Sequence, residues 1–116
     1  MAHNQRVGKW GEGQAALYLA ERGYDIAARN VHTPYGEIDL IAGKDGLTVF
    51  VEVKTRVSHS ADPPETAVTG RKQSHMVACA EHYAQEHELD HWRIDVIAVQ
   101  RVAGQTEVLH FENAVT

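Results

Sequence analysis

The sequence predicts a mixed α/β fold: a mixed β-sheet of about five strands flanked by helices, in the order α-β-β-β-α-β-β. Two segments carry apolar residues at helical spacing, while the shorter segments between and after them show strand-like alternation. The second helical segment separates the strand segments 47–55 and 92–100, so it permits a parallel crossover, which is expected to be right-handed.

The first half of the chain is expected to form one helix and three strands. Residues 5–22 carry a broad apolar face at helical spacing, and Gly23 is a suitable helix end. Thr33 to Gly36 indicate a turn, and the GKDG segment at 43–46 indicates a hairpin. The strands around these two turns are expected over residues 24–32, 37–43 and 47–55.

The second half is expected to form a loop, a helix and two strands. Serine and proline residues predict a loop over 56–69, and Thr69 is a candidate N-cap for a helix over about 70–88. Residues 92–100 alternate as a buried strand, and residues 106–111 are expected to form an edge strand.

Composition restricts the class of protein. The 116 residues are expected to form one domain, 1–116, and the 43% hydrophobic and 23% charged residues are ordinary for a globular protein. Cys79 is the single cysteine, which excludes an intrachain disulfide and favours a reducing compartment. The first residues carry no apolar signal core, and no apolar run approaches the ~20 residues that span a bilayer. We therefore expect a cytoplasmic protein with no membrane partner.

Charge argues against one kind of nucleic-acid binding. A net charge of −5 does not suit a protein that coats nucleic acid through global attraction, although a local basic site remains compatible with it. Lys54, Arg56, Arg71 and Lys72 provide such a local concentration of positive charge.

Two strand segments carry acidic residues at positions where buried strands rarely do. In residues 47–55, Val49, Val51 and Val53 should share one face, which leaves Glu52 and Lys54 on the other face. Unpaired carboxylates in otherwise buried runs destabilise a fold, so such residues are expected to be paired or to bind a cation.

The preceding segment, 37–43, repeats the pattern. Ile38, Leu40 and Ala42 should share one face, and Asp39 should lie on the other face with Glu37. Hairpin pairing of the two segments would bring Asp39 near Glu52 and Lys54. Two close carboxylates suit a hard cation such as Mg²⁺, and a neighbouring lysine can hold a phosphate oxygen or the attacking water.

These residues resemble the PD-(D/E)xK nuclease pattern, with Asp39, Glu52 and Lys54 in the three positions and Ile38 where proline is most common. The segments GEGQAALYL, GYDIAARN, GEIDLIA, VFVEVKTR and RIDVIAV, together with Lys72, resemble the YraN family over nearly the whole chain. That family of small bacterial proteins has a restriction-endonuclease-like core similar to archaeal Holliday-junction resolvases. The resemblance therefore implies a restriction-endonuclease-like sheet, and it implies the chemistry better than the substrate.

The resemblance also implies roles for individual residues. Asp39, Glu52 and Glu12 would hold Mg²⁺ or Mn²⁺ with the backbone carbonyl of Val53, and Lys54 would be the catalytic lysine. Arg56, Arg71 and Lys72 would contact phosphates of the nucleic acid. Glu12 also borders the apolar face of the first helix, and Glu37 is a weaker site candidate.

Simpler interpretations stand beside these. Glu52 and Lys54 could lie on an exposed strand face, and Glu12 could be a solvated helix residue. Asp95 is expected to form a structural ion pair with Arg93, two residues before it on the same strand face. Cys79 is expected in the core, and the histidines show no zinc-ligand spacing.

Three functions are compatible with the sequence. The first is an Mg²⁺- or Mn²⁺-dependent nuclease acting on DNA, including branched or structured DNA, on which a symmetric homodimer would place two cuts. An edge strand over 101–116 or the end of the first helix could form that interface. The second is a catalytically silent nucleic-acid-binding module with the same fold, favoured by the overall acidity. The third, a protein-interaction domain, predicts no affinity for metal or nucleic acid.

Overall fold

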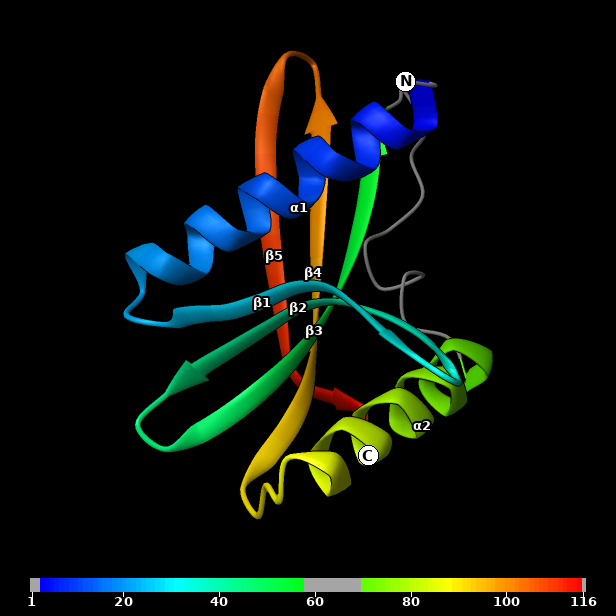
Figure 1. Ribbon diagram of the computed structural model, residues 1–116. Helices are drawn as coiled ribbons and strands as arrows, with labels where there is room; N and C mark the ends of the chain where they lie inside the picture. The colour runs from blue at the N-terminus through cyan, green and yellow to red at the C-terminus, as the bar shows by residue number, and fades with distance from the viewer. Residues whose placement is uncertain (1–2, 58–69, 116) are drawn as a thin grey trace.

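The computed structural model describes the backbone of residues 3–57 and 70–115 and the side chains of residues 6–56 and 75–114. Figure 1 shows how the helices lie around a curved sheet. The elements are α1 (His3–Glu21), β1 (Asp25–Thr33), β2 (Gly36–Lys44), β3 (Leu47–Val57), α2 (Gly70–Glu86), β4 (Trp92–Val102) and β5 (Gln105–Val115). The predicted element order is confirmed, and β5 is longer than the expected segment 106–111.

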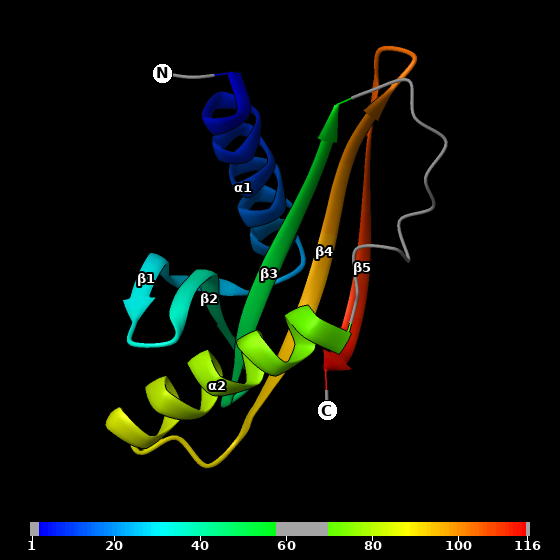
Figure 2. The same ribbon diagram turned by 90° about the vertical axis from the view of Figure 1, so that its right-hand side faces the viewer.

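The sheet is mixed and follows the chain order β1-β2-β3-β4-β5. All neighbouring strands are antiparallel except β3 and β4, which pair in parallel from Thr48 beside Trp92 to Val57 beside Arg101. The expected parallel crossover through the second helix is therefore confirmed. Figure 2 shows α1 and α2 near opposite ends of the long strands β3 and β4.

The first helix covers one face of the sheet. Ala15, Ala16 and Leu19 of α1 are buried against valines of β3, and Gly23 ends the helix at a φ of 89°. Burial of this apolar area is the main force that fixes α1 on the sheet. The strand residues of this core are Leu40, Ala42, Val49, Val51, Ile97 and Val99.

The second helix covers the opposite face, where Phe50 is fully buried. Met76, Cys79 and Ala80 of α2 pack against this ring, which also meets Tyr83 and Trp92 edge to face. Cys79 is thus a core residue, as predicted. Within the described residues, neither helix is long and apolar enough to cross a membrane.

One predicted face is wrong. Ile38 packs with Ile41 and Phe50 under α2, whereas Leu40 and Ala42 pack under α1, so Ile38 does not share their face. β1 changes face at the same level, because Ala28 and Val31 both pack under α2 although they are three residues apart. Asn30, one of the two residues between them, has a φ of 51°, which breaks the regular alternation of an extended strand.

Several predictions fall outside the described part of the chain. The loop expected over 56–69 is described only to residue 57, and Thr69 is not described. The backbone of Arg71 and Lys72 belongs to the first turn of α2, but their side chains are outside the described set.

Candidate functional site

Asp39 is attached to β3 by its side chain. The described ladder between β2 and β3 runs from Lys44 beside Leu47 to Leu40 beside Val51, and Asp39 lies one residue beyond it. Its Oδ2 accepts a hydrogen bond from the backbone N–H of Val53 at 2.8 Å. The carboxylate therefore lies against the stretch of β3 that carries Glu52 and Lys54.

Lys54 and Glu52 form an ion pair along the same strand. Lys54 Nζ lies 3.3 Å from Glu52 Oε1, and the two side chains retain 26% and 16% of their solvent exposure. Two residues further along β3, Arg56 is also partly buried. A partly exposed lysine on a flexible side chain can turn towards an anionic ligand.

A close helix–strand contact brings Glu12 to this region. Gly11 is buried against Thr55 of β3, and a Cβ atom at position 11 would overlap the Thr55 side chain. The glycine therefore permits α1 to approach β3 closely at the level of Lys54. Glu12, the next residue, lies near enough to Asp39 for its charge to affect the pKa of that aspartate.

The carboxylates repel one another. Burial, together with the charges of Glu52, Glu12 and Glu37, raises the pKa of Asp39 to about 7 against the lowering effect of the Val53 N–H. Burial also raises the pKa of Glu12, with the charge of Glu37 as the next cause. Such a raised pKa identifies an acidic site that lacks a sufficient positive partner.

Two residues of this cluster had little or no place in the sequence prediction. Asn30 of β1 was not singled out, yet its side-chain nitrogen lies 3.2 Å from Glu12 Oε1 and 3.1 Å from Glu37 Oε1. Both neighbours are acceptors, so the NH₂ of the amide faces them. Glu37, a weaker candidate from sequence, also pairs with His32, whose Nδ1 lies 3.4 Å from Glu37 Oε2. An asparagine inside a strand pattern was the only available signal.

Oxygen donors dominate the cluster and suit a hard divalent cation. Asp39, Glu52 and Glu12 offer carboxylates, and their mutual repulsion is the kind that a bound Mg²⁺ or Mn²⁺ relieves. Among the described side chains, those of residues 6–56 and 75–114, no group of three or more histidine, cysteine, aspartate or glutamate residues is arranged so that it could hold a metal ion. The observed contact of Val53 with the site is through its N–H, and the role of its carbonyl stays a prediction.

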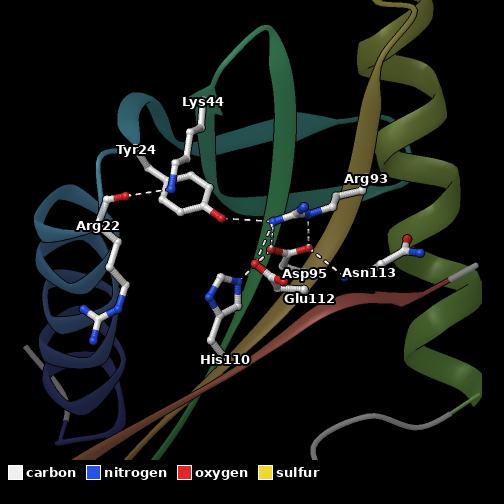
Figure 3. Close-up of polar contacts among 8 residues, drawn as sticks. All are labelled: Arg22, Tyr24, Lys44, Arg93, Asp95, His110, Glu112 and Asn113. Atoms are coloured by element: carbon white, nitrogen blue, oxygen red, sulfur yellow. Dashed lines mark hydrogen bonds and ion pairs between the residues drawn. The ribbon is translucent and has the colours of Figure 1, made fainter.

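A second acidic group, Asp95 of β4, lies apart from this cluster in a network shown in Figure 3. Asp95 is fully buried, and Arg93 contacts both of its oxygens, with Nε 2.9 Å from Oδ1. His110 Nε2 lies 2.6 Å from Oδ2, and the Asn113 N–H donates to Oδ1 at 2.9 Å. The predicted structural ion pair between Arg93 and Asp95 is confirmed.

The fold and the site define a class: a small mixed α/β protein in which an acidic cluster and a lysine meet on neighbouring strands. The chain belongs to the family described as Uncharacterised protein family UPF0102, whose model matches residues 11–99. This match confirms the resemblance to the YraN family.

Relatives of the same description cover most of the chain. A UPF0102 protein of Syntrophotalea carbinolica is 44% identical over 93% of this chain and 89% of its own length. One from Syntrophomonas wolfei is 42% identical over 96% of this chain and 98% of its own. Another, from Chloroflexus aurantiacus, is 46% identical over 87% of this chain and 84% of its own. These names assign no activity.

Proposed function

We propose that this protein hydrolyses phosphodiester bonds of nucleic acid with a divalent cation, as an endonuclease acting on structured or branched DNA. The observation that supports it most is the raised pKa of Asp39 in a cluster with Glu52 and Glu12, next to a lysine. Clustered carboxylates beside a lysine can bind a cation and an anionic substrate together.

The proposed ligands are the carboxylates of Asp39, Glu52 and Glu12, together with the carbonyl of Val53. Hard oxygen donors favour Mg²⁺ or Mn²⁺ over softer metals. When bound, the cation would neutralise charge on the scissile phosphate and help to activate water.

The remaining residues act on the substrate. Lys54 would release its ion pair with Glu52, 3.3 Å away, and donate to a nonbridging phosphate oxygen, where negative charge increases in the transition state. Arg56 on β3 and, on α2, Arg71 and Lys72 would contact flanking phosphates and orient the strand. Phosphate contacts of this type carry no base specificity. The single buried thiol, Cys79, fits a reducing cytoplasmic location.

A catalytically silent DNA-binding module is the second candidate. The net charge of −5 favours weak, local binding over extensive coating of nucleic acid. The clustered carboxylates oppose it, because without a cation they would repel the phosphates that the module must hold. Cation dependence therefore separates the two functions. A homodimer, which would suit symmetric cutting, belongs to the same proposal and would appear as a second copy in solution.

The test is cleavage of labelled single-stranded, duplex and four-way-junction DNA with Mg²⁺, Mn²⁺ or EDTA. Wild type should cut only with a cation, and Asp39→Asn should not cut. The matched control is Asp45→Asn, the same change at an exposed hairpin residue whose φ of 52° asparagine tolerates. Salt-sensitive binding without any cutting by the wild type would reject the nuclease and favour the binding module.

A further inference from the structure

Asn30 occupies a place that a strand residue does not normally take. Its φ of 51° lies in the left-handed region, which is strained for most residues and tolerated by asparagine and glycine. The residue therefore turns the backbone of β1 out of regular alternation at the level of Asp39. Asn30 is exposed, so burial of apolar surface does not explain its backbone conformation.

The amide of Asn30 joins two carboxylates from different elements. Its nitrogen lies within hydrogen-bonding distance of Glu12 Oε1 on α1 and Glu37 Oε1 on β2, at 3.2 and 3.1 Å. An amide nitrogen carries two hydrogens, so it can satisfy both acceptors at once. This contact opposes the mutual repulsion of the two acids and restricts the direction of the Glu12 carboxylate.

Glu37 is itself held from the other side. Its Oε2 lies 3.4 Å from His32 Nδ1, and His32 is its partner in the ladder between β1 and β2. The chain of contacts therefore runs from the hairpin through Glu37 and Asn30 to Glu12. Groups that orient a metal ligand without touching the metal commonly change the affinity of the site for the metal tenfold or more.

We propose that Asn30 is a positioning residue that directs the Glu12 carboxylate towards Asp39, with Glu37 fixing the amide. This proposal deepens the proposed function and rests on it for the cation. In this proposal Glu37 orients Asn30 and is not itself a metal ligand, and Asn30 is necessary for tight divalent-cation binding.

The variant that tests it is Asn30→Gly. Glycine adopts a φ near 50° without strain, so the backbone of β1 is retained while the amide is lost. The matched control is Asn113→Gly, the same change at a residue with a φ of 48° in β5, near Asp95 and away from the cluster. Asn113 contacts Asp95 through its backbone N–H, which glycine keeps.

The first measurement is Mn²⁺ affinity by titration calorimetry, with the thermal midpoint recorded on the same samples. Asn30→Gly should weaken Mn²⁺ binding about tenfold or more at nearly unchanged thermal midpoint, and Asn113→Gly should leave the affinity unchanged. In cleavage assays at saturating Mn²⁺, the loss should shrink, because excess cation compensates for a poorly directed ligand. Equal Mn²⁺ affinity in Asn30→Gly and wild type would overturn the proposal.

A metal-free measurement keeps the two proposals separable. Urea unfolding in EDTA should show that the effects of Asn30→Gly and Glu12→Gln are not additive, whereas Asn113→Gly and Glu12→Gln should be additive. Additive effects for the first pair would remove the contact between Asn30 and Glu12 and overturn the inference. A wild type without Mn²⁺ affinity would reject the metal-dependent nuclease, and this unfolding cycle alone would then decide whether Asn30 orients Glu12.

Discussion

Two aspartates in the same sheet have opposite electrostatic environments. Burial would raise the pKa of Asp95, but hydrogen bonds from His110, the Asn113 N–H and Arg93, with the charge of Arg93, outweigh it and lower that pKa. At Asp39, burial and then the charges of neighbouring carboxylates raise the pKa to about 7, against a single hydrogen bond from the Val53 N–H. The same residue type is thus fully compensated on β4 and poorly compensated on β2.

The comparison separates structural acids from functional ones. Asp95 links β4 to β5 through a network in which Arg93 also reaches the Tyr24 hydroxyl at 3.0 Å and Glu112 at 3.2 Å (Figure 3). The folded protein already supplies every partner that this carboxylate requires. Asp39 lies among the charges of Glu52, Glu12 and Glu37, a repulsion that a bound cation would relieve.

The largest expected effect is on stability at Asp95. Asp95→Ala should lower the free energy of unfolding by about 3–5 kcal/mol, because it leaves the partly buried Arg93 guanidinium without its anion and the His110 ring without its hydrogen-bond partner. Asp39→Ala should change it far less, since it relieves repulsion while losing one hydrogen bond. Urea unfolding of both variants measures the difference, and equal destabilisation would contradict the division between the two aspartates.

The next effect is on activity at Lys54. Lys54→Ala should reduce DNA cleavage by about 10²-fold or more, close to 2.7 kcal/mol in the barrier, because a donor to the developing phosphate charge is lost. Its partly exposed ion pair with Glu52 should contribute under about 1 kcal/mol to stability. Cleavage rates and urea unfolding of the same variant give both values.

The control for that variant is Lys44→Ala, which removes an exposed lysine whose Nζ donates to the Arg22 carbonyl at 2.9 Å, away from the acidic cluster. Cleavage by this control should match the wild type. Full activity in Lys54→Ala would remove the lysine from the proposed mechanism.

The smallest expected effect is the pH dependence that Asp39 causes. Its pKa is about 7 in the folded protein, above the ordinary 3.8, so between these values the folded state holds a proton that the unfolded state lacks. Stability should therefore fall as pH rises from about 5 to about 7, by about 2 kcal/mol at most. Asp95 acts in the opposite direction. Because its pKa is lowered in the folded protein, its contribution to the stability of the protein is lost as the pH falls below the ordinary aspartate pKa.

Urea unfolding of wild type and Asp39→Asn in EDTA at several pH values isolates this contribution. The asparagine variant should lose most of the downward slope between pH 5 and pH 7, since it has no proton to release there. An unchanged slope in Asp39→Asn would contradict the assignment of this pH dependence to Asp39.

The sequence alone predicted much of the fold. Helical spacing and strand alternation are local properties, so they located the two helices, five strands and the order in which they follow one another. The valine face of β3 was also correct, since Val49 and Val51 lie in the core under α1. Asp39, Glu52 and Lys54 stood out because charged residues in apolar strands are rare.

Tertiary structure decided which of these groups meet. Alternation failed at Ile38, because the left-handed Asn30 in the neighbouring strand accompanies a change of face in both strands. The bond from Val53 to Asp39 depends on where the ladder between β2 and β3 ends. Neither feature has a periodic signal in the sequence.

The sequence by itself thus determined the elements and the candidate acids of this protein. Only the tertiary structure decided that Asn30 bridges Glu12 and Glu37, and that Asp95 is hydrogen-bonded to His110 from β5. The physical reason is that the regular spacing of apolar side chains in a helix or strand is set by neighbouring residues along the chain. The pairing of charges, in contrast, is set by strand register and helix packing between segments that are distant in sequence.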